Sequence, residues 1–253
     1  MRNNDALKDS VLSAPELLPL LSSDAVKNWG ETLVVAPHPD DESLGCGGAI
    51  ALLRQYDCAV SVLAMSDGTL SHPNSKKFPA SVLRELRENE MLTALNILGV
   101  TASDVEFLRY RDRSVPNKDS PDFGAAVEIC QRYLKRIAPH TILLPWRRDP
   151  HPDHQAANQI LTRAVGQLKT APKIIEYAIW IWDLANASDA PQSDEVRAFR
   201  LDIAKVNAKK QTAIAAHRSQ ITNLIDDDPE GFRLTPETLA NFAVPWEIYL
   251  ENA

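Results

Sequence analysis

The chain has 253 residues, of which 44% are hydrophobic, enough for the core of one large α/β domain. Its formal net charge is −7, and it has no basic tract of the kind that follows a phosphate backbone, so we expect no nucleic-acid partner. No apolar run reaches the length of a membrane span, and the first residues lack the apolar core of a signal peptide. The three cysteines are odd in number and widely spaced, which fits a reducing cytoplasm. We therefore expect a cytoplasmic protein that acts on a small molecule and not on a membrane.

Residues 1–30 are predicted to form a short helical arm. The apolar patch of this arm would consist of Leu17, Leu18, Leu20 and Leu21. After it, strand patterns alternate with helix patterns, which is typical of βαβ units and a mainly parallel sheet. The predicted strands cover residues 32–37, 59–65, 104–109, 141–145, 173–182, 196–202 and 245–250.

The predicted helices cover residues 42–56, 80–98, 122–138, 154–168 and 203–217. The polar segments 69–79, 111–121 and 183–195 are predicted to be loops, and those above a site would shape its pocket. No repeat or low-complexity linker divides the chain. We expect a single domain over residues 1–253 with a Rossmann-like α/β fold, in which helices flank a mainly parallel sheet.

Two short strings of histidine and aspartate each follow a predicted strand. His38-Pro39-Asp40-Asp41-Glu42 comes after Leu33-Val34-Val35, and Asp149-Pro150-His151-Pro152-Asp153-His154 comes after Thr141-Ile142-Leu143-Leu144-Pro145. Ligands of open α/β sheets bind at the carboxyl ends of strands, so these distant strings can meet at one site. Imidazole and carboxylate together are the ligand set of a catalytic zinc or a similar divalent metal.

A purely structural interpretation of the first string is also available. Asp40 or Asp41 would then be the N-cap of the next helix, and His38 an ordinary loop histidine. The second string favours the metal interpretation, because His151 and His154 are three residues apart with a carboxylate between them. Ligating and catalytic histidines commonly need such a carboxylate to fix their tautomer.

The helix over residues 80–98 has two charged residues in the middle of its apolar stripe. The stripe consists of Leu83, Leu86, Ala94, Ile97 and Leu98. Arg87 and Glu90 fall within it, where charges are costly unless they are paired or used. One interpretation is an ion pair between them that reaches solvent. The other directs Arg87 at an anionic or hydroxyl-rich ligand.

Other candidates have simpler interpretations. The glycines of Gly45-Cys46-Gly47-Gly48 do not fit the GxGxxG spacing of a dinucleotide site, and close helix–sheet packing explains them better. His217 would be a cation at a helix C-terminus. The pair Arg147-Arg148 would contact an anionic substrate group or form a solvated surface pair. We expect no function for His72 or His140.

Together the two strings resemble the zinc-dependent N-acetylglucosaminyl deacetylase family, also called the PIG-L or LmbE-like family. Weaker matches are Ser66-Asp67-Gly68, Arg87-x-x-Glu90 followed by Leu98-Gly99-Val100, and the helix end His217-Arg218-Ser219-Gln220. The matches run from about residue 32 to residue 220. The resemblance implies a Rossmann-like fold and the hydrolysis of N-acetyl groups from amino sugars and their conjugates.

The resemblance also implies roles for seven residues. His38, Asp41 and His154 would bind the metal, normally Zn²⁺, with Fe²⁺ or another divalent ion as the alternative. Asp40 would be the general base, and Arg87 would contact the substrate. His151 would stabilise or protonate the tetrahedral intermediate, with Asp153 orienting it.

Three rival functions follow from the same residues. The glycine spacing argues against a nucleotide-dependent oxidoreductase. A two-metal phosphoesterase would need more bridging carboxylates than one ligand triad supplies. A non-catalytic sugar-binding protein would not need both Asp40 and His151. A homo-oligomer is compatible with the sequence.

Overall fold

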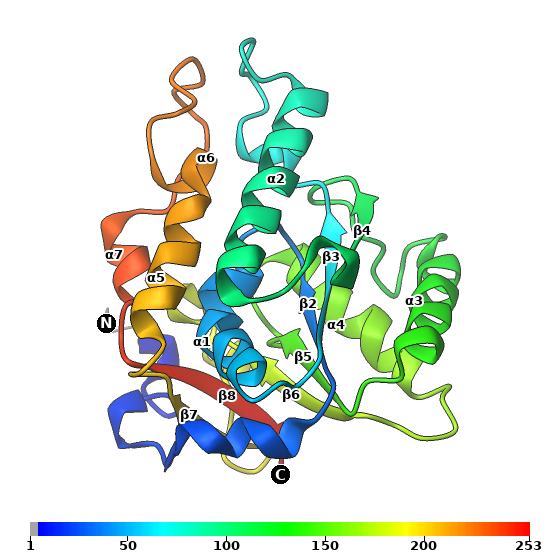
Figure 1. Cartoon of the computed structure of the whole chain (residues 1–253), viewed down its shortest axis with the longest axis vertical. Coiled ribbons are helices and arrows are strands. Elements are labelled where there is room, and N and C mark those ends of the chain that lie inside the picture. The colour runs from blue at the N-terminus through cyan, green and yellow to red at the C-terminus, as the bar shows by residue number, and fades with distance from the viewer. Residues whose placement is uncertain (1–4) are drawn as a thin grey trace.

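The computed structural model describes residues 5–253, which form a single mixed sheet covered by helices (Figure 1). Within this part of the chain, eight strands lie in the order β1-β7-β8-β6-β5-β2-β3-β4. Their bounds are β1 (Leu20–Leu21), β2 (Thr32–Ala36), β3 (Val60–Ser66), β4 (Val105–Tyr110), β5 (Thr141–Pro145), β6 (Lys173–Tyr177), β7 (Val196–Asp202) and β8 (Trp246–Asn252). Only β8 runs antiparallel to its neighbours, so the expected mainly parallel α/β sheet is confirmed.

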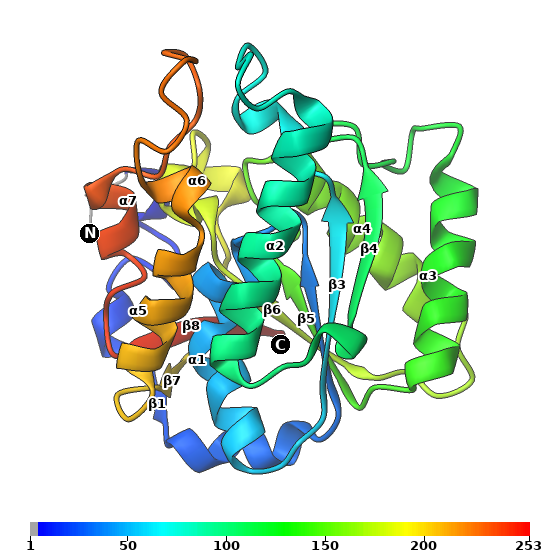
Figure 2. The same ribbon diagram turned by 45° about the horizontal axis from the view of Figure 1, so that its top comes forward.

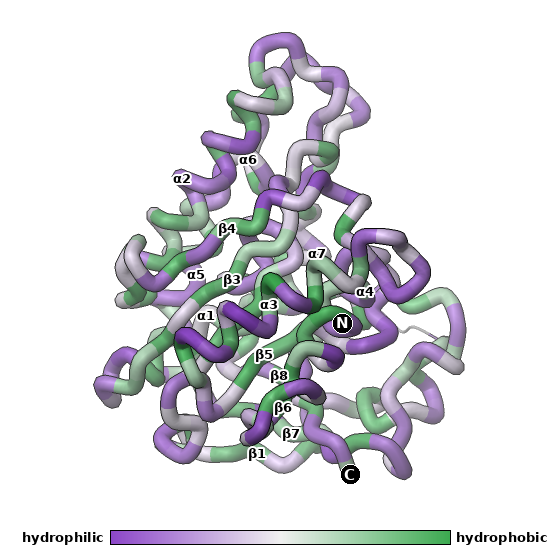
Figure 3. The backbone as a smooth tube through the Cα atoms, turned by 90° about the vertical axis from the view of Figure 1, so that its right-hand side faces the viewer, coloured by the Kyte–Doolittle hydropathy of each residue, from purple (hydrophilic) through white to green (hydrophobic). Residues whose placement is uncertain are grey.

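Helices cover both faces of the sheet (Figure 2). Their bounds are α1 (Asp41–Gln55), α2 (Ala80–Leu98), α3 (Phe123–Ile137), α4 (Pro152–Val165), α5 (Asn207–Ala216), α6 (Arg218–Ile221) and α7 (Pro236–Ala240). One apolar core lies between the sheet and α1, α2 and α5, and a second lies between the sheet and α3 and α4. This double cover explains why β2 and β5 are buried along their whole length and read as continuous apolar runs. Figure 3 shows the hydrophobic residues gathered in the sheet.

The pairing of β2 with β5 brings the two His/Asp strings together. The strands are parallel, with Thr32 opposite Thr141 and Val34 opposite Leu143. Both strings therefore leave the same edge of the sheet on adjacent strands, and each leads into a helix, α1 or α4. On one side of β2 the sheet continues with β5, and on the other side it continues with β3. Such a point, where the strand order reverses, is where open α/β sheets bind ligands.

The glycines of α1 are explained by close packing, as expected. A Cβ on Gly45 would lie 2.4 Å from the Tyr177 ring, and one on Gly48 would lie 2.5 Å from Ile203. Both distances are shorter than real contacts, so only glycine lets α1 lie this near to β6 and to the chain after β7.

Two predicted elements are wrong in their extent. The strand predicted over 173–182 ends at Tyr177, and Trp180–Asp183 form a 3-10 turn, because the Trp180 N–H donates to the Asp149 carboxylate instead of to a neighbouring strand. The helix predicted over 203–217 begins at Asn207 and is interrupted at His217, whose ψ of 56° is not helical.

The predicted helical arm is only partly helical over its described residues. It consists of three short 3-10 helices and the short strand β1, which pairs with β7. Of its predicted apolar patch, Leu17 is 79% exposed and Leu20 is 52% exposed. Residues 1–4 of the arm lie outside the described part of the chain. No helix in residues 5–253 is long and apolar enough to cross a membrane.

Candidate functional site

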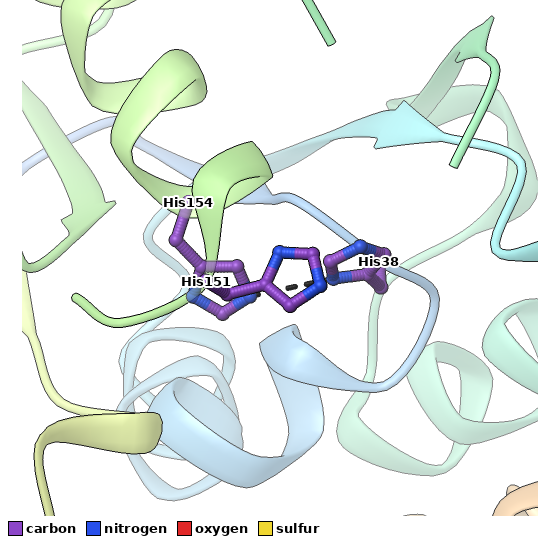
Figure 4. A group of neighbouring side chains, drawn as sticks. All are labelled: His38, His151 and His154. Atoms are coloured by element: carbon purple, nitrogen blue, oxygen red, sulfur yellow. Dashed lines mark hydrogen bonds between the residues drawn. The ribbon is translucent and has the colours of Figure 1, made fainter. Parts of the chain in front are cut away.

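His38, Asp41 and His154 bring three ligand atoms together at the carboxyl edge of the sheet. Figure 4 shows the two histidines beside His151. His38 Nδ1 lies 3.3 Å from Asp41 Oδ2 and 3.3 Å from His154 Nε2. The third side of the triangle, from His154 Nε2 to Asp41 Oδ2, is 3.2 Å. His38 follows β2, Asp41 is the first residue of α1, and His154 lies in the first turn of α4. The three side chains are buried.

The size of this triangle matches a zinc site. Ligands placed 2.0–2.1 Å from a tetrahedral zinc lie about 3.3 Å from one another. Two other groups also have donor atoms within 4.8 Å of one another. They are His38, His151 and His154, and His38, Asp112, His151 and Asp153. We favour the triangle because His151 uses its Nδ1 to accept the Asp153 N–H. Two histidines and one carboxylate also suit Fe²⁺.

Further carboxylates hold the two histidines of the triangle. Asp149 Oδ1 lies 3.4 Å from His154 Nδ1. On the far side of the His38 ring, Nε2 lies 3.2 Å from Asp153 Oδ2 and 3.4 Å from Asp112 Oδ1. Carboxylates on the second ring nitrogen fix the tautomer and raise the basicity of a metal-binding histidine.

The surplus of buried carboxylates favours a bound cation. Burial opposes protonation of His154, but Asp41 and Asp149 outweigh it and raise the pKa of His154 to about 9. The pKa of His38 is raised well above its usual value in the same way, by Asp112, Asp153 and Asp41. Buried charges of one sign must be compensated. The donor set therefore fits a divalent metal ion, which would take the place of the protons on the two imidazoles.

Asp40 has an unusual backbone and a buried side chain beside the triangle. Its φ of 150° is rare for a residue with a side chain, and such strain is often found at functional sites. It occupies the N-cap position of α1, but its side chain makes no capping hydrogen bond. Burial raises the pKa of Asp40 to about 6, although the Arg87 guanidinium acts in the opposite direction.

Arg87 is paired with Asp40 and not with Glu90, so the interpretation of the two α2 residues as an ion pair is wrong. Arg87 Nη2 donates to Asp40 Oδ2 over 3.1 Å and to the Pro39 carbonyl over 2.9 Å, and Nη1 donates to the Gly68 carbonyl over 2.7 Å. Glu90 instead accepts two hydrogen bonds from Ser219. Of the predicted stripe, Leu83, Ala94 and Leu98 are buried, while Leu86 and Ile97 are partly exposed.

His151 lies against the triangle, with its ring centroid 4.5 Å from that of His38. It is the N-cap of α4, where its Nδ1 accepts the Asp153 N–H over 3.2 Å. The expectation that the Asp153 side chain orients His151 needs correction, because that carboxylate bonds to His38 and to the N–H groups of Arg113 and Val115. Burial and the imidazoles of His38 and His154 lower the pKa of His151 to about 4.

A pocket of about 400 Å³ opens over these residues. The lining residues include His38, Asp40, Asp41, Arg87, His151, Leu70, Ser71, Asp112, Arg113, Trp180, Asp183, Gln220 and Phe232. All three predicted loops contribute, the first through Leu70 and Ser71, the second through Asp112 and Arg113, and the third through Asp183. A further loop, after α6, reaches the pocket through Phe232. It lies beside the first loop (Figures 1 and 2), and Asp227 Oδ1 accepts a hydrogen bond from Ser75 Oγ over 2.7 Å.

Several other candidates lie outside this pocket. Arg147 binds Glu176, Arg148 binds Glu195, and both guanidinium groups stack on Trp146, so both arginines are structural. Cys46 is buried within α1. His217 is the C-cap of α5, as expected for a cation at a helix C-terminus, but it is buried and bonds through Nε2 to Glu42 Oε1 over 3.1 Å.

Sequence reasoning assigned no role to two carboxylates of the site, Asp112 and Asp149, although Asp149 begins the second string. Contact with His38 outweighs burial and lowers the pKa of Asp112 to about 2. Asp149 is completely buried and also accepts the N–H groups of His151 and Trp180. Both residues follow the carboxyl end of a parallel strand, β4 or β5. The rule that identified the two strings could therefore have found them.

A family model and several known proteins match the chain. The model of the PIG-L family, described as GlcNAc-PI de-N-acetylase, matches residues 33–165. A Bacillus cereus protein described as "probable N-acetyl-alpha-D-glucosaminyl L-malate deacetylase 2" is 28% identical over 198 residues, which are 77% of this chain and 86% of that protein. Its namesake in Bacillus subtilis is 27% identical over 83% of this chain and 92% of its own length.

Solved structures show the same fold. The N,N'-diacetylchitobiose deacetylase from Pyrococcus horikoshii, solved with an inhibitor, superposes with a TM-score of 0.64. The superposition covers 89% of this chain and 81% of that one, at 22% sequence identity.

Proposed function

The chain belongs to the PIG-L family, and from this membership and its site geometry we propose that it is a zinc-dependent N-deacetylase of amino sugars or their conjugates. One observation carries the proposal: the His38–Asp41–His154 triangle has the dimensions of a three-ligand metal site, and Asp40 lies beside it on the wall of a pocket. The proposal treats residues 1–253 as one domain, which the continuous sheet from β1 to β8 supports.

The metal would supply the electrophilic part of the chemistry. Bound by His38, Asp41 and His154, it would lower the pKa of a water molecule towards about 7 and polarise the amide carbonyl. Asp149, Asp153 and Asp112 would hold the two imidazoles in position for it.

Asp40 would move the proton. Its pKa near 6 leaves it ionised at neutral pH yet basic enough to accept a proton from the attacking water. Arg87 holds the carboxylate through Oδ2. The water oxygen bonds to the amide carbon, the carbon–nitrogen bond breaks, and Asp40 passes the proton to the leaving nitrogen. The products are acetate and a free amine.

His151 would stabilise the developing oxyanion as a neutral imidazole. Because Nδ1 accepts the Asp153 N–H, the ring proton of neutral His151 is on Nε2. This Nε2–H can donate to an oxyanion without the ring being charged. The lowered pKa of His151 makes a protonated imidazolium unfavourable, so of the two expected roles we propose stabilisation of the intermediate and not its protonation.

The pocket wall suits a sugar. Trp180 and Phe232 stand edge to face, with ring centroids 5.8 Å apart, and both line the pocket. Their apolar surfaces can cover the C–H face of a sugar ring, while Arg87, Gln220 and Asp183 offer polar groups to its hydroxyls. The Bacillus relatives and the Pyrococcus enzyme are named for substrates of this type.

An acetate-release screen tests the proposal. Zinc-loaded protein is incubated with N-acetylated sugars, nucleotide sugars and sugar conjugates, with Asp40→Asn as the inactive control. Acetate release that depends on both Asp40 and the metal supports the proposal. Phosphate release from phosphorylated members of the panel without acetate release would favour the phosphoesterase alternative. Sugar binding without any hydrolysis would favour a binding protein.

A further inference from the structure

Gln220 has a buried side-chain carbonyl without a partner, and it belongs to the pocket wall. The residue is 0% exposed, at the end of α6. Its Nε2 donates to Ser219 Oγ over 2.9 Å and to Ser71 Oγ over 3.4 Å, but its Oε1 has no hydrogen-bond partner among the described residues. An unsatisfied buried acceptor is costly, so a ligand donor is the natural partner for it.

The orientation of the Gln220 amide is determined by a chain of hydrogen bonds from α2. Glu90 Oε1 accepts the backbone N–H of Ser219 over 2.8 Å, and Glu90 Oε2 accepts its hydroxyl over 2.6 Å. Because the Ser219 hydroxyl proton is directed at Glu90, its oxygen can only accept from Gln220. The NH₂ of Gln220 must therefore face Ser219, which leaves Oε1 as the free atom. This arrangement also explains a buried Glu90 on the inner face of α2.

The hydrogen bonds of Gln220 do not involve the metal triangle. Its side chain bonds to Ser219 and to Ser71 in the first pocket loop, and it makes no bond to a triangle residue or to Asp40 among residues 5–253. The scissile amide has to lie at the triangle. The group that meets Gln220 is therefore a more distant part of the substrate.

We propose that Gln220 is a specificity-determining residue whose Oε1 accepts a hydrogen bond from a hydroxyl of the substrate's sugar ring. The inference rests on the proposed function. A hydroxyl is the fitting group because it both donates and accepts, and the same pocket is lined by Arg87, whose buried Nε–H is also without a partner in the described chain. Glu90 and Ser219 are then positioning residues, which hold the amide with its carbonyl towards the pocket.

The test compares wild type with Gln220→Met on a set of sugars that each lack one ring hydroxyl. Methionine has nearly the volume of glutamine, but its thioether sulfur is only a weak acceptor. The parent sugar is the methyl glycoside of N-acetylglucosamine, and kcat/KM is measured with zinc-loaded protein. For wild type, kcat/KM should be about 10- to 100-fold lower with one of the deoxy sugars than with the parent sugar, because the buried acceptor is then left unpaired. For Gln220→Met, kcat/KM with the same deoxy sugar should be within about twofold of kcat/KM with the parent sugar.

The inference would be overturned if the two proteins showed equal decreases in kcat/KM for every deoxy sugar. It would also be overturned if Gln220→Met had the wild-type kcat/KM on the parent sugar. Gln211→Met is the matched control, because Gln211 bonds to Phe242 and Asn207 and does not line the pocket. Zinc content and melting temperature show that each variant is folded and loaded.

Binding provides a second readout that does not depend on turnover. The corresponding glucosamine glycosides are titrated into zinc-loaded wild type and Gln220→Met by calorimetry. The sugar that lacks the critical hydroxyl should bind wild type more weakly than its parent and should bind the variant equally well. If wild type releases no acetate from any sugar, the proposed function fails. The calorimetric comparison still supports or overturns the role of Gln220.

Discussion

His154 Nε2 lies 3.3 Å from His38 Nδ1, although 116 residues separate them in the sequence. Two imidazole nitrogens at this distance, each also close to Asp41 Oδ2, need a shared proton or a shared cation between them. The four carboxylates around the two rings, Asp41, Asp112, Asp149 and Asp153, favour the cation. The arrangement is therefore best understood as a metal site, and this has direct consequences for variants.

Replacing His154 by alanine should sharply reduce the bound metal. The variant loses one of three ligands and leaves Asp149 without its imidazole partner. Metal content is measured by elemental analysis after dialysis against a weak chelator. His140→Ala is the control, because His140 is exposed and lies away from the pocket. Full metal occupancy in His154→Ala would remove His154 from the ligand set.

Replacing Asp40 by asparagine should keep the metal and the fold but lower kcat by about 10²-fold or more, the usual contribution of a general base. Asparagine tolerates a positive φ as aspartate does, and its carbonyl can still accept from Arg87. Initial rates of acetate release are compared with those of Asp119→Asn, a change at an exposed loop position. If Asp40→Asn keeps near wild-type turnover, another group is the base.

Replacing Arg87 by lysine should lower kcat and also reduce stability. The guanidinium makes three buried hydrogen bonds, one of them to Asp40, and an ammonium cannot match that geometry. A loss of about 1–3 kcal/mol would lower the melting temperature by roughly 2–4 °C per kcal/mol in a chain of this size. Thermal denaturation and steady-state kinetics measure the two effects. The control is Arg84→Lys, on the exposed face of the same helix.

This outcome differs from the one that the sequence alone suggests. A purely substrate-contacting Arg87 would change KM and leave the melting temperature alone. A KM effect without any change in kcat or stability would contradict the structural role that we assign to the Asp40–Arg87 contact.

Much of the site could be predicted because its ligands come from residues that are close in sequence and follow strand patterns. The strands β2 and β5 read as buried apolar runs, and the edge rule for parallel sheets places both strings together. Which carboxylate faces which imidazole could not be predicted in the same way. His38 exposes two nitrogens on opposite sides of its ring, and Asp153 bonds to it because α4 turns that side chain away from His151.

The partners of Arg87 and Glu90 were also beyond sequence patterns. A helical stripe shows which side chains face inwards, but Asp40 is 47 residues from Arg87, and Ser219 is 129 residues from Glu90. Their pairing depends on the packing of α2 against α1 and α6. Similarly, an apolar run after β6 predicted a longer strand, although the Asp149 carboxylate draws the Trp180 N–H into a turn.

A buried ion pair beneath α1 should make a large contribution to stability. Lys210 Nζ lies 2.8 Å from Glu247 Oε1, and both residues are buried. Glu247 also accepts N–H groups of Gly48 and Ala49 in α1. Lys210→Met should therefore lower the free energy of unfolding by about 3–5 kcal/mol, because it leaves a buried carboxylate unpaired.

Urea denaturation measures this loss. Lys209→Met is the control, one position earlier on the exposed face of α5. The double variant Lys210→Met/Glu247→Gln should recover part of the stability, since neither charge then remains buried. A single variant as stable as wild type would show that the ion pair contributes nothing.

The last prediction concerns His217 and the pH dependence of folding. Burial lowers the pKa of His217, but Glu42 outweighs it and the pKa lies above the usual 6.5. A histidine with a raised pKa in the folded state stabilises the fold fully below the unfolded pKa, and this contribution is lost as the pH rises through the folded pKa. The gap in melting temperature between wild type and His217→Gln should therefore be widest near pH 6 and should narrow as the pH rises. Thermal melts in a chelating buffer measure the gap without a contribution from metal binding. A gap that is constant with pH, or that widens, would show that His217 is neutral in the folded protein and only fills space beside Glu42.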